Sequence, residues 1–292
     1  MDIGLVLQIV LAGLGIGIIY SMVGMGYSMI YRSMGLINFA HGSIFMIGAY
    51  LGWTFYVPLR FPFPLAFLFG FLSTAAIGYF LEWILRPLSR IDLLFMLIGT
   101  LALGIVFDNL ALIIWGAEAI VFPAPLGSKT LTLGTLAIEP QTVLILILSP
   151  LFMVVLQVFM QRSRTGKAMR AAAQDGETAG AMGISLHRMN ALTLALGSGL
   201  GALAGILAGP IFLLSPNMGW SVAVKGFAAA IIGGFGNPIG AIVGGLIFGI
   251  IESVSAFFIS STYKYAISFI VTIAVLMFKP RGIFGEPMVE KL

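Results

Sequence analysis

Apolar runs separated by short polar segments fill the chain from one end to the other. Several of these runs reach about 20 residues, the length at which a helix crosses a bilayer core of about 30 Å. They lack the alternation of polar and apolar residues that marks barrel strands, and only helices and closed barrels satisfy their backbone hydrogen bonds inside lipid. The pattern therefore predicts an all-α fold, a polytopic transmembrane helical bundle.

Nine of the apolar runs are candidate spans. The seventh and the ninth contain about 14 residues each, so either could be a re-entrant half-helix, and we expect eight or nine crossings. The first run follows an acidic residue and is too long for the apolar core of a signal peptide, so we expect a retained first helix. The candidate spans are residues 3–30, 36–57, 64–85, 93–115, 142–160, 190–214, 222–235, 239–259 and 265–278.

The composition agrees with a membrane protein. Hydrophobic residues make up 60% of the chain and charged residues 9%, against about 25% charged in ordinary soluble domains. We expect residues 1–292 to form a single transmembrane domain that is surrounded by lipid and has no soluble catalytic part. The net charge of +4 does not indicate a nucleic-acid partner, because the basic residues gather in a few loops.

Those basic residues predict the orientation of the chain. Eleven of them fall on one predicted side and three on the other, and positively charged loops stay in the cytoplasm. The loop 161–189 and the C-terminus are therefore expected inside, and the N-terminus and the loop 116–140 outside. The inner set is Arg32, Arg86, Arg90, Arg162, Arg164, Lys167, Arg170, Arg188, Lys279, Arg281 and Lys291, and the outer set is Arg60, Lys129 and Lys264.

The inner loop 161–189 is the longest polar stretch of the chain. Residues 167–174 are strong helix formers, Asp175 is then a plausible N-cap, Glu177 suits the first turn of a helix, and Gly183 suits its C-terminal end. This predicts about two turns of helix that could dock into a groove of a cytoplasmic partner. The alternative is a solvated loop with ordinary positive-inside charge.

Polar residues within or beside the spans are candidates for the lining of a translocation path, because such residues usually face a bundle interior or a water-filled cavity. Asn38 and His41 stand near the cytoplasmic end of the second span. They could line a path, or Asn38 could be a cap or turn residue and His41 a hydrogen-bonded packing residue. No metal or catalytic role is expected for His41, because the only other histidine, His187, lies in the inner loop.

Further in-membrane candidates lie nearer the outer side. Asp108 and Asn109 precede Trp115 by about two helical turns, and Lys225 is at a similar depth. We expect an Asp108–Lys225 contact, with separate partners or snorkelling as the alternative. Asn237 stands in a Gly-Asn-Pro break, which is either a tight turn or a place where backbone carbonyls face a cavity.

Three blocks of sequence resemble one family. "GLINFAHGSIFMIGAY", "GKAMRAAAQDGETAGAMGIS" and "KGFAAAIIGGFGNPIGAIVGGLIFGIIES", together with the ending "FKPRGIFG", are similar to the LivH-type permeases of branched-chain amino acid ABC importers. The second block is similar to a degenerate form of the permease coupling motif of that family. Ala171 stands where a glutamate is usual in ABC importers in general, and no proline follows Ile184.

The resemblance implies a bacterial inner-membrane permease that pairs with a second related permease, two cytoplasmic ATPase subunits and an external solute-binding protein. It implies leucine, isoleucine, valine or a related amino acid or amide as cargo, and ATP hydrolysis by the partners, with no cofactor bound by this chain. The residues that it implies for ATPase coupling are Arg170, Ala172, Asp175, Glu177, Ala179, Gly183 and Ile184.

Two other classes of function are weighed against this one. An ion-coupled secondary transporter or channel would need acids near the midplane on broken helices, and Asp108 is the only acid well placed. An intramembrane hydrolase would need a nucleophile with a nearby base or a zinc-binding motif, and neither pattern occurs. An ABC permease also explains the long basic loop and the absence of a soluble domain.

Overall fold

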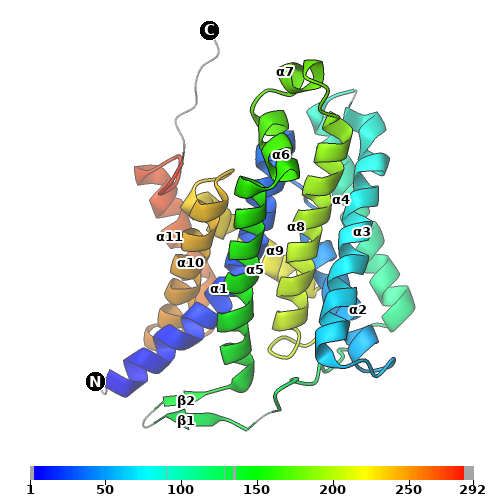
Figure 1. The fold of residues 1–292 in the computed structure, drawn as a ribbon. Coiled ribbons are helices and arrows are strands. Elements are labelled where there is room, and N and C mark those ends of the chain that lie inside the picture. The colour runs from blue at the N-terminus through cyan, green and yellow to red at the C-terminus, as the bar shows by residue number, and fades with distance from the viewer. Residues whose placement is uncertain (1–2, 90, 128, 134–135, 286–292) are drawn as a thin grey trace.

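The computed structural model describes residues 3–89, 91–127, 129–133 and 136–285, which form a helical bundle with a small β-hairpin at one end (Figure 1). Arg90 and Lys291, both counted among the inner basic residues, lie outside the described residues. The elements are α1 (Ile3–Met34), α2 (His41–Tyr56), α3 (Phe63–Ser89), α4 (Leu93–Trp115), β1 (Leu131–Leu133), β2 (Leu136–Ile138), α5 (Pro140–Arg162), α6 (Arg164–Gln174), α7 (Gly176–Ala181), α8 (Leu186–Ala208), α9 (Met218–Gly233), α10 (Pro238–Phe258) and α11 (Lys264–Phe278).

The helical, polytopic character predicted from the sequence is confirmed. Within the described part of the chain, six helices are long and apolar enough to cross a membrane, namely α1, α3, α4, α5, α8 and α10, and α9 and α11 are shorter apolar helices. Helix α2, with 16 residues, spans only about 24 Å at 1.5 Å per residue. The expected eight or nine crossings therefore stay a prediction.

Two helix boundaries differ clearly from the apolar runs. The second span was expected from residue 36, but α2 begins at His41, because residues 36–38 have no regular secondary structure and a turn precedes the helix. The sixth was expected to end at residue 214, but α8 ends at Ala208, just before Gly209 and Pro210. Gly209 keeps helical backbone angles, but Pro210 has no N–H to donate a helical hydrogen bond, so the regular helix does not continue past it.

The two long polar segments lie at opposite ends of the bundle. The β-hairpin, within residues 116–140, is at the end where α1 begins, and α6 and α7 are at the opposite end, where α11 finishes (Figure 1). The hairpin is formed by the antiparallel pairing of β1 with β2, in which Leu131 faces Ile138. This arrangement agrees with loops on opposite sides of a membrane, and the assignment of each end to a side stays a prediction.

The core lies around α1, α2, α8 and α9. In α8, 83% of the apolar window is buried, against only 17% in α4. Helices α3, α4 and α5 turn long rows of apolar side chains outward, as lipid-facing helices do. The central helices are therefore shielded, and polar groups on them must find partners within the protein.

The bundle contains an inverted structural repeat. Helices α1 to α4 and α8 to α11 follow the same packing scheme with opposite directions along the bundle (Figure 1). In this repeat α1 corresponds to α8, α2 to α9 and α3 to α10. The contact of α1 with α10 therefore corresponds to that of α8 with α3, and the contact of α2 with α8 corresponds to that of α9 with α1. Such repeats are a common way to build transporter folds.

Close contacts between small residues occupy equivalent places in the two halves. Gly42 and Gly219, each the second residue of its short helix, lie against each other where α2 crosses α9. Gly78 lies against Ser198, and in the equivalent place Gly245 lies against Ser21. Ser21 precedes the first residue of α2 by 20 residues, and Ser198 precedes the first residue of α9 by the same number. A side chain at any of these glycines would push the backbones apart, so the glycines set the distance between the crossing helices.

Candidate translocation path and coupling segment

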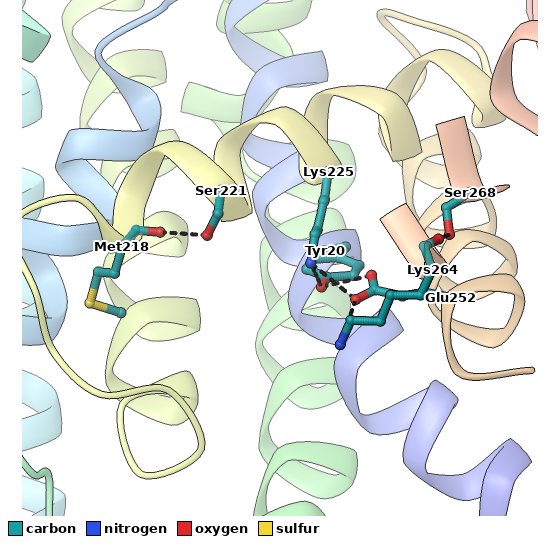
Figure 2. A network of polar contacts seen from close by, with 7 residues as sticks. All are labelled: Tyr20, Met218, Ser221, Lys225, Glu252, Lys264 and Ser268. Carbon is teal, nitrogen blue, oxygen red and sulfur yellow. Dashed lines mark hydrogen bonds and ion pairs between the residues drawn. The ribbon is translucent and has the colours of Figure 1, made fainter. Parts of the chain in front are cut away.

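A buried network of charged and polar side chains joins α1, α9 and α10 (Figure 2). The Nζ of Lys225 lies 3.0 Å from Oε1 of Glu252 and donates to the Tyr20 hydroxyl at 2.9 Å. The Tyr20 hydroxyl in turn donates to Oε2 of Glu252 at 3.0 Å. Only 6% of Lys225 and 4% of Glu252 are exposed. Each charge therefore has a partner, as an apolar environment requires.

Helix α11 adds a second cation and an aromatic ring to this network. Lys264 approaches Oε1 of Glu252 to 3.9 Å, and the Nζ of Lys225 stands 3.9 Å from the centre of the Tyr265 ring. The expected Asp108–Lys225 contact is therefore wrong, because Lys225 pairs with Glu252. Neither Glu252 nor Tyr20 was singled out from the sequence as a partner of Lys225.

Asp108 and Asn109 sit on α4, the long helix with little burial. Asp108 is half-buried and lies beside Ser43 at the start of α2. Asn109 is exposed, and its side-chain amide donates to the Ile105 carbonyl of the preceding turn at 2.7 Å. Asn109 is thus turned toward the outer surface of a helix that is otherwise apolar there, and Asp108 lies where α4 meets α2.

Asn38 shapes the turn that leads into α2. Its side-chain oxygen accepts from the backbone N–H of Ala40 at 3.1 Å, and its carbonyl accepts from the N–H of His41 at 3.1 Å. The expected cap or turn role of Asn38 is confirmed. The turn is also tied to α4, because the N–H of Phe39 donates to the Thr100 hydroxyl at 3.2 Å.

His41 is fully buried at the start of α2, between α1 and α8. Its ring meets the Tyr27 ring edge-on at 4.6 Å and fills the space left by Gly26 and Gly201. The expected packing role is confirmed, but the expected hydrogen bonding is not, because neither ring nitrogen has a hydrogen-bond partner among the described residues.

Asn237 caps α10 and ties down the C-terminal segment. Its side-chain oxygen accepts from the N–H groups of Ile239 and Gly240, both at 3.1 Å, and its amide donates to the Phe284 carbonyl at 3.1 Å. The tight-turn interpretation of this break is therefore confirmed. The N–H of Phe284 also donates to the Gly233 carbonyl at 2.9 Å, so the ending "FKPRGIFG" satisfies a free carbonyl at the end of α9.

The coupling segment is a pair of capped helices at the end of the bundle opposite the hairpin (Figure 1). The Asp175 side chain accepts from the N–H of Thr178 at 3.1 Å and starts α7, with Glu177 in the first turn. Gly183 has a φ of +85°. Its N–H donates to the Gly180 carbonyl at 3.0 Å, and the N–H of Ile184 donates to the Ala179 carbonyl at 3.0 Å. This is a Schellman end, so both predicted caps are confirmed.

The remaining residues of the coupling segment divide between its inner and outer faces. Helix α7 has only six residues, fewer than the two turns expected, because the Schellman turn ends it after Ala181. Ala172 and Ala179 are buried, whereas Met182 is 80% exposed. Arg170 is exposed and donates to the Gln161 carbonyl at 3.3 Å. The exposed Met182 offers an apolar contact at the outer tip of the segment.

Glu82, on α3 beside the coupling segment, was not singled out from the sequence. It is buried, and its Oε1 lies 3.0 Å from Nδ1 of His187 and 3.6 Å from Nε of Arg86. The spacing of Glu82 and Arg86, four residues apart on one helix, was the available signal. The contact with His187 joins residues 105 positions apart, and no local pattern predicts it.

Comparison with known proteins was made over the whole chain. Residues 9–276 match the family described as the permease component of the branched-chain amino acid transport system. The high-affinity branched-chain amino acid transport system permease proteins LivH of Escherichia coli K12 and BraD of Pseudomonas aeruginosa are 32% and 33% identical to the chain. The alignments cover 98% of this chain and 97% and 98% of those proteins. No solved structure matches the chain significantly.

Proposed function

The chain belongs to the permease components of branched-chain amino acid transport systems, and from this premise we propose how its residues serve such a system. It is a transport subunit and not an enzyme. The observation that carries the function is the similarity over 98% of the chain to permeases named for branched-chain amino acids. The cargo is leucine, isoleucine, valine or a related amino acid or amide, delivered across a bacterial inner membrane.

ATP hydrolysis by two separate cytoplasmic subunits drives the transport. These subunits contact α6 and α7, which pass the movement of the ATPase on to the bundle. The capped ends of α7 support this role, because a short helix held at both ends moves as one body when a partner pushes it. Met182 and Glu177 are exposed on its outer side, where an ATPase groove would meet them. Ala172 and Ala179 pack inward and connect the segment to the bundle.

The translocation path runs beside α4, between this chain and a second related permease. The exposed Asn109 and its half-buried neighbour Asp108 support this assignment, because polar side chains that face lipid are costly and usually mark a partner or a water-filled cavity. Lys225 and His41 are enclosed by the protein, so their roles are to hold α9 and α2 in place. Asn237, as a helix cap, lies outside the path.

An external solute-binding protein docks at the end that carries the β-hairpin. Residues 116–140 support this because they form the long polar segment opposite α6 and α7 (Figure 1). In this orientation the N-terminus is external and the C-terminus cytoplasmic. Glu118, Lys129 and Glu139 supply charges that steer the encounter more than they add affinity.

The test of this function is the ATP hydrolysis rate of the reconstituted assembly with a panel of amino acids. Leucine, isoleucine or valine, added with the binding protein, should raise the rate above that of the ligand-free assembly. A charged amino acid such as lysine is the control and should leave the rate at its basal value. A rate that no amino acid or amide changes would contradict the proposed cargo.

A further inference from the structure

A pocket of about 380 Å³ opens between the C-terminal end of α3 and the first turn of α8. Both helix ends lie at the end of the bundle that carries α6 and α7 (Figure 1). The pocket is lined by Tyr79, Phe80, Trp83, Arg86, His187 and Arg188, together with Glu82 and Ala191. The function proposed above assigns no role to this pocket.

Positive charge outweighs negative charge around the pocket. Two arginines, Arg86 and Arg188, line it against a single carboxylate, Glu82. That carboxylate already contacts His187 at 3.0 Å and is 7% exposed, so it turns little charge toward an incoming ligand. Arg188 is exposed and forms no ion pair with any described residue. The pocket therefore favours an anion that approaches from its open side.

The open side of the pocket continues the lipid-facing surface of α3. Exposed apolar residues follow one face of that helix from Leu65 through Leu68 and Leu72 to Phe80 and Trp83. Trp83 is 70% exposed and Phe80 63%. Amphipathic aromatic rings gather where the headgroups of a membrane meet its hydrocarbon core. The arginines thus stand at the level of the headgroups, at the end of an apolar stripe.

We propose that this pocket binds the headgroup of an anionic phospholipid. Arg86 and Arg188 would hold the phosphate, and the exposed row on α3 would contact the acyl chains. Basic pockets between helices on the cytoplasmic side of membrane proteins bind anionic headgroups in this way. The combination of two arginines with an apolar stripe favours a lipid over a free phosphate ion, which would have no use for the stripe.

Native mass spectrometry of the purified full-length chain in a non-ionic detergent tests the proposal. Phosphatidylglycerol and phosphatidylcholine with the same acyl chains serve as the two probes. The parent protein should retain phosphatidylglycerol in preference to phosphatidylcholine. Arg188→Gln should weaken phosphatidylglycerol binding about fivefold, because each basic residue near an anionic membrane surface contributes on that order. Arg188→Lys should restore most of the binding.

A matched control separates the pocket from general charge. Arg162→Gln with Arg164→Gln removes two exposed cations at the same end of the bundle, and it should leave the lipid preference unchanged. Arg86→Gln with Arg188→Gln should abolish that preference. Arg188→Gln alone keeps the test valid if loss of the Arg86–Glu82 contact impairs folding.

Three results would overturn the proposal. One is equal retention of the two lipids by the parent, and another is an equal loss of binding in the control variant. The third is displacement of phosphatidylglycerol by millimolar inorganic phosphate, which would assign the pocket to a soluble anion. The outcome does not depend on the cargo, so a failure here leaves the transport function untouched.

Discussion

Lys225 is tolerated in the middle of the bundle because its charge is surrounded by groups that replace water. Glu252 neutralises it, the Tyr20 hydroxyl bridges the two, and the Tyr265 ring faces the ammonium group at 3.9 Å (Figure 2). A buried ion pair adds little net stability, but removal of one member leaves the other charge without compensation. The network therefore matters most as a constraint that keeps α1, α9, α10 and α11 together.

Substitutions in this network should differ in severity. Glu252→Gln removes the only carboxylate of the network and leaves Lys225 and Lys264 as unpaired cations, so we expect a loss of about 3–5 kcal/mol in stability. Lys225→Met should cost less, because Lys264 still lies 3.9 Å from Glu252. Lys264→Met should cost least, since its side chain is 31% exposed. Melting temperatures in detergent measure the order, and equal values for Glu252→Gln and Lys264→Met would contradict it.

At single positions, the sequence predicted the roles of residues whose hydrogen-bond partners lie close by in the chain. Asn38 and Asp175 bond to backbone groups two and three residues away, and their residue types alone indicate such turns and caps. The partner of Lys225 could not be predicted in the same way. Lys225 and Glu252 are 27 residues apart, and Tyr20 is 205 residues from Lys225, so only the packing of three helices brings them together.

Among the elements, α7 depends most on its ends, because six residues are too few to form a stable helix alone. Asp175→Ala should reduce local helix stability by about 1 kcal/mol. Gly183→Val should cost more, since a β-branched residue strongly disfavours the positive φ at that position. Both variants should insert normally but hold the ATPase subunits less tightly, as measured by co-purification, and should take up less substrate.

Gly180→Val is the matched control for Gly183→Val. Gly180 has open space around its Cα and a φ outside the left-handed region, so valine costs little there beyond its weaker helix propensity. This variant should keep its ATPase subunits. A Gly183→Val protein that keeps its ATPase subunits and transports at the parental rate would contradict the coupling role of α7.

The C-terminal segment is a second element whose position depends on one cap. Asn237→Ala removes two acceptor contacts at the start of α10 and the donor to Phe284. We expect a loss of about 1 kcal/mol and faster hydrogen exchange at the amides of Ile283 and Phe284. Asn217→Ala is the control, because Asn217 precedes α9 without a side-chain cap bond. Equal exchange rates in the two variants would argue that the contact of Asn237 with Phe284 does not hold the C-terminal segment in place.

The helices themselves were largely predictable from the apolar runs, and their ends less so. Helix α4 agrees with its run from residue 93 to 115. Helix α2 begins later than its run, because the Asn38 turn and the contact of Phe39 with Thr100 hold the preceding residues outside the helix. Hydrophobicity does not distinguish a buried extended segment from a buried helix.

For the molecule as a whole, the placement of the two polar segments at opposite ends gives a testable topology. The native chain contains no cysteine, so single cysteines report their own side of the membrane. Ser185→Cys should react with an impermeant thiol reagent only from the cytoplasmic side. Ala119→Cys, in the opposite exposed segment, should react only from outside. External labelling of the cysteine at 185 would reverse the orientation.

The inverted repeat is the feature of the whole molecule that the sequence did not reveal. Helix pairs such as α1–α10 and α3–α8 are equivalent in packing, and small residues such as Gly42 and Gly219 stand at equivalent crossing points. Packing constrains size there and leaves the other positions free to differ. The repeat therefore becomes visible only from the contacts between helices.

Uptake of labelled leucine tests the central claim, that ATP hydrolysis by partner subunits drives branched-chain amino acids through this permease. The measurement uses proteoliposomes that contain the full assembly and the binding protein, with ATP supplied to the ATPase side. We predict accumulation that requires ATP, persists when ion gradients are collapsed, and is lost in Gly183→Val but kept in Gly180→Val. Accumulation that follows a proton or sodium gradient without ATP would contradict the account.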